Sequence, residues 1–275
     1  MMELNYENGH FLEIEPGLDL YYEDHGRGEP LLFIPGITMT TRVFERQVAH
    51  FAGKYRVITM DPRSQGRSGK VVFGNTYAQH GRDLARLIDH LGLRELTLIG
   101  WSTGNLDVWS YVDQFGTDLL KGAITIDMPP KPLSDAPADW VEFSMADMTQ
   151  IMTELLTSSA GQRDFFADLT RQVMLENPTD EEVNRIVEMS LNTPYYIFHT
   201  LYTNAVLGDW REAAKTLDDR VPSLMFLAKH WSGVAEPYMN KYFPKTKTVV
   251  LGGHMMFWDH ADEFNRVVDE FLAGK

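Results

Sequence analysis

The stretch "LIGWSTGNLD", residues 98–107, ends an apolar run at Gly100 and places Ser102 between two glycines. A segment with a helical pattern follows directly. A strand, a tight turn and a helix together form the setting of a nucleophile elbow, in which the residues two before and two after the serine must lack bulk. The N-terminus of the following helix offers free N–H groups to an oxyanion. We therefore expect Ser102 to be a nucleophile rather than a helix-capping serine.

Short apolar segments alternate with helical patterns on both sides of this turn. The strand-like segments are residues 30–36, 55–61, 96–101, 122–127, 221–228 and 247–253, and the helical patterns include residues 41–53, 76–92, 103–116 and 260–274. Strands that are apolar along their whole length and separated by helices are typical of a mostly parallel sheet covered on both faces. Residues 10–26 read as an additional hairpin around Pro16 and Gly17.

The alternation of strand-like and helical segments stops after Met128. A Pro-rich stretch is followed by helical patterns up to about residue 208, with no convincing strand. Thr179 with Glu182 three residues later predicts a capping box. The sequence therefore predicts an α/β fold with a helical cap inserted after the sixth strand. The expected parts are a core over residues 1–128, a cap over 129–209 and the rest of the core over 210–275.

Composition narrows the possible functions. The chain has 275 residues, a formal net charge of −14 and no cysteine. The negative charge disfavours nucleic acid or an anionic membrane as a partner, and the missing cysteines exclude disulfides and thiolate chemistry. No basic, apolar leader opens the sequence, and no apolar run is long enough to span a bilayer. We expect a cytoplasmic monomer or homodimer.

A serine nucleophile needs a base. His254 follows the last predicted strand on a glycine-led loop, and the carboxyl ends of parallel strands share one edge of a sheet. His254 can therefore meet Ser102 there. His260 is the neighbouring rival but better fits the entry to the final helix, and His199 lies on an aromatic-rich helix of the cap.

Several motifs carry a family resemblance. "FIPGITMTTRVFE" (33–45), "DPRSQGRS" (61–68), "GWSTG" (100–104) and "GGHMMFWDHADEFNRVVDEFL" (252–272) resemble motifs of the α/β-hydrolase superfamily. The resemblance covers nearly the whole chain, and is strongest to bacterial serine hydrolases often labelled non-haem chloroperoxidase-like. Two positions depart from the common pattern: Pro35 stands where histidine is usual, and Ser64 replaces the first glycine of its loop. We interpret Asp61 and its loop as a structural turn.

The expected position of the triad acid also departs from the common pattern. Most of the superfamily has an aspartate after the strand at residues 221–228, but here that turn reads "AKHWSGVAEP", with Trp231 near the usual position. A minority take the acid from the strand after the nucleophile helix, and Asp127 ends that strand. The resemblance thus implies Asp127 as the group that orients His254. Glu236 remains the alternative.

The resemblance also implies an oxyanion hole formed by the backbone N–H groups of Ile37 and Thr103. Methionine and aromatic residues at helical spacing are usually core, but in a cap they also suit a bulky apolar substrate. The candidate substrate-binding residues are Trp101, Trp140, Phe143, Tyr196 and Met255.

The sequence thus favours a serine hydrolase of the carboxylesterase or lactonase type, acting on an apolar ester or lactone through an acyl-enzyme on Ser102. This chemistry requires no metal and no organic cofactor. Two alternatives stay open. The superfamily includes cofactor-independent dioxygenases of quinolone-like substrates that use a His–Asp dyad, and the same scaffold can serve as a ligand receptor.

Overall fold

The computed structural model describes residues 8–134, 136, 139–142 and 144–274. Its centre is an eight-stranded sheet in the order β1-β2-β4-β3-β5-β6-β7-β8. The strands are β1 (Gly9–Glu15), β2 (Leu18–Gly26), β3 (Pro30–Ile34), β4 (Arg56–Asp61), β5 (Leu96–Trp101), β6 (Leu120–Ile126), β7 (Ser223–Leu227) and β8 (Lys247–Val250). Only β2 runs antiparallel to both its neighbours, so the predicted N-terminal hairpin and the mostly parallel sheet are both confirmed.

Alternate residues of each central strand enter different cores. Leu31 and Phe33 of β3 join one apolar cluster, and Leu32 and Ile34 join the other. The first cluster packs against α1 (Glu45–Phe51), α10 (Met256–Asp259) and α11 (Ala261–Ala273). The second packs against α2 (Tyr77–His90), α3 (Gly104–Phe115), α8 (Arg211–Arg220) and α9 (Ser232–Tyr242). The sheet is therefore covered on both faces, which explains why its central strands are apolar throughout.

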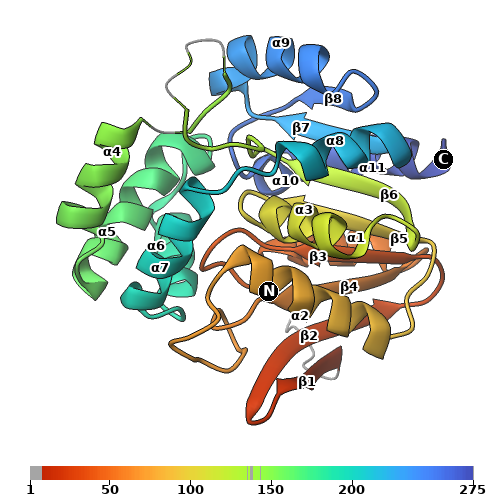
Figure 1. Cartoon of the computed structure of the whole chain (residues 1–275), viewed down its shortest axis with the longest axis horizontal. Coiled ribbons are helices and arrows are strands. Elements are labelled where there is room, and N and C mark those ends of the chain that lie inside the picture. Colours follow the sequence, from red (N-terminus) through yellow and green to blue (C-terminus); the bar gives the residue numbers. More distant parts are fainter. Residues whose placement is uncertain (1–7, 135, 137–138, 143, 275) are drawn as a thin grey trace.

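The cap lies between β6 and β7. It contains α4 (Met145–Gln150), α5 (Ser159–Leu169), α6 (Asp180–Ser190) and α7 (Tyr195–Val206), together with the π-helical turns η3 (Ile151–Leu155) and η4 (Thr170–Met174). Figure 1 shows these helices gathered at one side of the molecule, beside the sheet. The predicted insertion of helices after the sixth strand is confirmed.

Capping decides where the cap helices begin. The first helix of the cap, α4, begins at Met145, where the side chain of Ser144 accepts the N–H of Asp147 in a capping box. The capping box predicted for Thr179 and Glu182 is confirmed at the start of α6. Among the described residues, no helix combines the length and apolar character needed to cross a membrane.

Candidate active site

Ser102 follows β5 directly and has the backbone conformation of an elbow. Its φ is 53°, in the left-handed region that non-glycine residues rarely occupy. Gly104 opens α3 so close to β3 that an added Cβ would lie 2.4 Å from the carbonyl oxygen of Ile34. The predicted absence of bulk two residues after the serine is thus a steric requirement of the turn.

Sheet register brings Ser102 beside Asp127. Trp101 of β5 pairs with Ile126 of β6, and the N–H of Ser102 donates to the carbonyl of Ile126 over 2.8 Å. Asp127 is the next residue on its strand and also has a left-handed backbone, with φ at 55°. Two neighbouring strands therefore end in sharp turns, each of which carries a polar side chain to the same edge of the sheet.

The carboxylate of Asp127 is fully buried and accepts three hydrogen bonds. Oδ2 lies 2.7 Å from Nδ1 of His254, and Oδ1 accepts from the backbone N–H of Ala228 and from Nε1 of Trp231, each over 2.7 Å. Buried carboxylates are stable only when hydrogen-bonded in this way. These partners hold Asp127 against His254 and leave Nε2 as the ring nitrogen available to other groups.

The loop that carries His254 is fixed by the core and by the cap. The indole Nε1 of Trp101 donates to the carbonyl of His254 over 2.9 Å. The N–H of His254 donates to Val173 and that of Met255 donates to Met174, both in η4. The π-helical turn of the cap therefore helps to position the imidazole.

Ser102 and His254 line one cavity of about 280 Å³. Trp101, Ile37 and Thr103, which the sequence suggested for substrate binding and for the oxyanion hole, line the same cavity. The remaining wall is mainly apolar and comes largely from α5, η4 and the segment after β7. Its lining residues are Gly36, Glu142, Phe165, Phe166, Leu169, Val173, Met174, Tyr202, His230 and Trp231.

Three titratable groups of this wall have shifted pKa values, and burial raises the pKa of Tyr202 well above its ordinary value. Burial raises the pKa of Glu142 to about 7; the imidazole of His254 opposes this shift and the carboxylate of Asp127 adds to it. Burial lowers the pKa of His230. A cluster of perturbed acids and bases in a cavity is typical of a functional site.

Three other candidate substrate-binding residues do not line the cavity. Trp140 is buried against Trp231, with ring centroids 5.6 Å apart, and is not a lining residue of the cavity. Met255 is fully buried and Tyr196 is 48% exposed, and neither lines the cavity. Phe143 lies outside the described residues.

The alternatives to His254 and Asp127 are also located away from the cavity. His260 precedes α11 as its N-cap residue and lies 3.1 Å from Glu176. His199 is on α7 and is not a lining residue, and Glu236 is exposed on α9.

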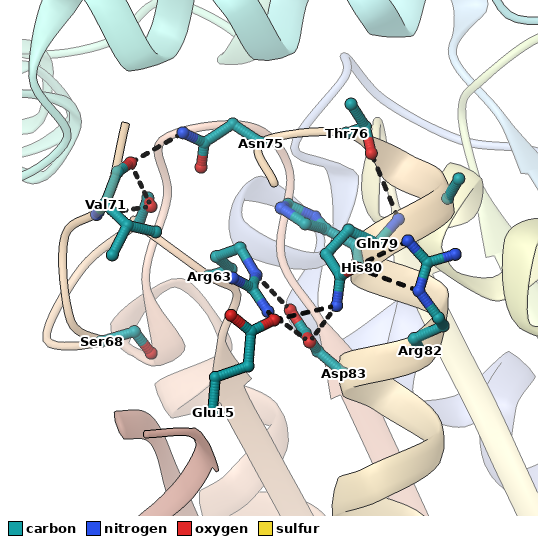
Figure 2. A network of polar contacts seen from close by, with 12 residues as sticks. Glu15, Arg63, Ser68, Val71, Asn75, Thr76, Gln79, His80, Arg82 and Asp83 are labelled. Atoms are coloured by element: carbon teal, nitrogen blue, oxygen red, sulfur yellow. Dashed lines mark hydrogen bonds and ion pairs between the residues drawn. The ribbon is translucent and has the colours of Figure 1, made fainter. Parts of the chain in front are cut away.

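The loop after β4 has a structural arrangement. Both oxygens of Asp61 accept backbone N–H groups, from Thr41 and Arg67, each over 2.7 Å. Burial nevertheless raises the pKa of Asp61 to about 7. Figure 2 shows Arg63 of the same loop directed at Asp83 and Glu15, and its buried guanidinium pairs with both. These contacts support the interpretation of the loop as a turn held by internal pairs.

Sequence reasoning missed most of the cavity wall. Glu142, His230 and Phe165 carry no motif, and only their spatial position marks them. Trp231 did give a signal, because it stands where most of the superfamily has the triad aspartate. In the folded chain its indole binds the aspartate that comes from β6 instead.

Comparisons with known proteins concern the fold of the chain. A family model described as alpha/beta hydrolase fold matches residues 29–261. A non-heme haloperoxidase of Rhodococcus erythropolis is 32% identical over 121 residues, which cover 44% of either chain. The chain thus matches less than half the length of this relative.

Solved structures are similar over almost the whole chain. A bromoperoxidase from Bacillus anthracis has a TM-score of 0.85 at 23% identity, covering 93% of this chain and 96% of its own. An esterase from Exiguobacterium antarcticum has a TM-score of 0.86 at 19% identity, covering 96% and 99%. At these identities the likeness shows a shared fold.

Proposed function

The chain belongs to the α/β-hydrolase family, and from this premise we propose that it is a serine hydrolase that cleaves a carboxylic ester or lactone. One observation carries the proposal. The Asp127–His254 pair, with its 2.7 Å hydrogen bond, shares a cavity with a serine on a left-handed elbow. This combination of nucleophile, base and orienting acid is the requirement for acyl transfer.

The proposed reaction has two steps. Nε2 of His254 takes the hydroxyl proton of Ser102 while Oγ attacks the substrate carbonyl, and the backbone N–H groups of Ile37 and Thr103 stabilise the oxyanion. The protonated imidazole then gives its proton to the departing alcohol, which leaves an acyl group on Ser102. Water, deprotonated by His254, attacks this acyl group, and the carboxylic acid is released with Ser102 restored. Asp127 holds the Nδ1 proton and stabilises the imidazolium throughout.

The character of the cavity supports an apolar substrate. Phe165, Phe166 and Leu169 of the cap share with the serine a cavity of about 280 Å³, which suits an acyl chain of moderate length or a ring. A lactone is an internal ester and follows the same steps, with the alcohol remaining attached to the acyl group.

Initial rates on a panel of p-nitrophenyl esters test the proposal. Ser102→Ala should lower kcat by at least about a thousandfold, because the nucleophile is lost. Glu236→Gln, an exposed change on α9, is the control and should retain the wild-type rate.

Turnover that persists in Ser102→Ala would contradict the proposal. Oxygen uptake with a quinolone-like substrate, without ester cleavage, would instead indicate a dioxygenase that uses the His254–Asp127 pair. Saturable binding without turnover by the wild type would indicate a receptor.

A further inference from the structure

Glu142 is a carboxyl group in a mainly apolar cavity wall, and the proposed reaction does not use it. It lines the cavity that holds Ser102, Thr103 and His254, and is close enough to His254 for the two groups to affect each other electrostatically. Glu142 is half-buried, and even partial withdrawal of a carboxyl group from water costs free energy unless the group gains a partner. Within the described ranges, no hydrogen bond or ion pair is found for its side chain. A polar ligand group would therefore be a suitable partner.

The backbone of Glu142 is held in place. Its N–H donates to the carbonyl of Pro132 over 2.9 Å. Two residues before it, Trp140 is 1% exposed and packs edge-on against Trp231, which itself donates to Asp127. Two residues after it, Ser144 caps α4. The backbone of Glu142 is thus held by Pro132, and a held backbone is what a specificity-determining residue needs.

Glu142 also adds an acidic group to the cavity wall. A carboxyl group accepts hydrogen bonds in both of its protonation states, through a carbonyl oxygen or a carboxylate oxygen. Glu142 and Asp127 together place two acidic groups around His254. A second carboxylate, brought in by a substrate, would meet like charge in a poorly solvated space.

We infer that Glu142 binds a hydrogen-bond donor on the substrate, so that the enzyme prefers neutral or cationic esters that carry a hydroxyl or amino group remote from the ester and discriminates against anionic ones. This inference rests on the proposed function and specifies its substrate class. The apolar lining would hold the carbon skeleton, while Glu142 would select its polar end.

Matched substrates test this inference. Ethyl esters of straight-chain acids of about four to ten carbons, a span that fits a cavity of this size, are compared with a hydroxyl, a methyl or a carboxylate group at the far end. At the chain length that reaches Glu142, the wild type should prefer the hydroxyl ester over the methyl ester by about tenfold or more in kcat/KM, since a hydrogen bond to a charged group is worth about that factor. Glu142→Leu should reduce this ratio to about one, and Glu142→Gln, whose amide oxygen still accepts, should keep part of it.

For the ester with a carboxylate at its far end, substitution of Glu142 should raise the rate of hydrolysis. At pH 8, above the pKa of about 7 of Glu142, hydrolysis of this ester should improve by about tenfold in Glu142→Gln, which removes the like charge but little volume. Glu154→Gln changes an exposed acidic residue of η3 in the same cap and is the matched control, with ratios equal to those of the wild type.

Binding measurements separate this inference from the proposed function. Calorimetry compares the affinities for the hydroxyl and methyl esters in three proteins: Ser102→Ala alone, and Ser102→Ala combined with either Glu142→Gln or Glu142→Leu. A preference for the hydroxyl ester that weakens with Glu142→Gln and disappears with Glu142→Leu supports the inference even if no ester is turned over. Equal affinities at every chain length, or a preference unchanged by both substitutions, would overturn it.

Discussion

Within the described residues, the pair His254–Asp127 at the sheet edge and the pair His80–Asp107 between α2 and α3 have nearly the same local geometry. Nδ1 lies 2.7 Å from a carboxylate oxygen in the first pair and 2.8 Å in the second, and all four side chains are buried or nearly so. The difference lies around them. His254 lines the cavity that contains Ser102, whereas Nε2 of His80 is buried without a hydrogen-bond partner among the described residues.

A histidine–aspartate pair does not by itself make a catalytic site. His80 packs edge-on against Tyr77, at 5.3 Å between ring centroids, and lies beside the Arg63 network (Figure 2). It is not among the residues that line the cavity with Ser102. The same pair of groups is thus a buried structural contact at one place and the proposed base and orienting acid at the other.

Exchanging the aspartate of each pair for asparagine tests whether the two pairs differ in function. Asp127→Asn should lower kcat/KM for a p-nitrophenyl ester by about a thousandfold or more, because the amide favours the wrong tautomer of His254 and does not stabilise its imidazolium. The measurement is steady-state kinetics, with circular dichroism to confirm folding. A loss of less than about tenfold would remove Asp127 from the proposed mechanism.

Asp107→Asn should instead act on stability. Replacing one partner of a buried pair weakens a charge-assisted hydrogen bond, and we expect the free energy of unfolding to fall by about 2 kcal/mol. The rate at a temperature where the variant is folded should stay within about threefold of the wild type. Denaturant unfolding and ester hydrolysis on the same sample check both. An activity loss as large as that of Asp127→Asn would mean that the two pairs do not differ in the way proposed.

Trp231→Phe tests the support around Asp127. The change removes the indole N–H that donates to Oδ1 over 2.7 Å but keeps an aromatic ring. Losing one such hydrogen bond should reduce kcat by about tenfold, with a smaller change in KM. No comparable donor is found beside Asp107 among the described residues. Wild-type kcat in Trp231→Phe would show that the remaining two donors suffice.

Glu142→Gln should produce the smallest effect, on the pH dependence of stability. The folded-state pKa of about 7 lies above the ordinary value of 4.5, so the folded protein retains a proton that the unfolded chain releases. The stability of the wild type therefore falls as the pH rises from about 4.5 to 7, whereas glutamine does not titrate. At pH 8 the variant should be more stable by about 1 kcal/mol. This is less than the full pKa shift would give, because Glu142 is half-buried and solvent screens its charge. Melting curves at pH 4 and pH 8 measure it, and an identical difference at both pH values would contradict the shift.

Local sequence patterns predicted the sheet, the cap and the start of one cap helix. Apolar strands such as residues 96–101 and the helical patterns between them predicted the mostly parallel sheet, and the gap in strands after Met128 predicted the cap. Thr179 and Glu182 predicted the start of α6. These features depend on spacings of a few residues, so they can be read without knowing the fold.

The tertiary structure decided which acid pairs with His254 and which side chains line the cavity. The sequence left Asp127 and Glu236 open as partners of His254, but sheet register brings Asp127 within 2.7 Å of the imidazole, and α9 leaves Glu236 exposed. No pattern marked Glu142 as a lining residue of the cavity. Contacts between residues far apart in the chain depend on register, on strand order and on the path of the cap, because these decide which side chains face one another across a cavity. Short-range spacing carries no information about them.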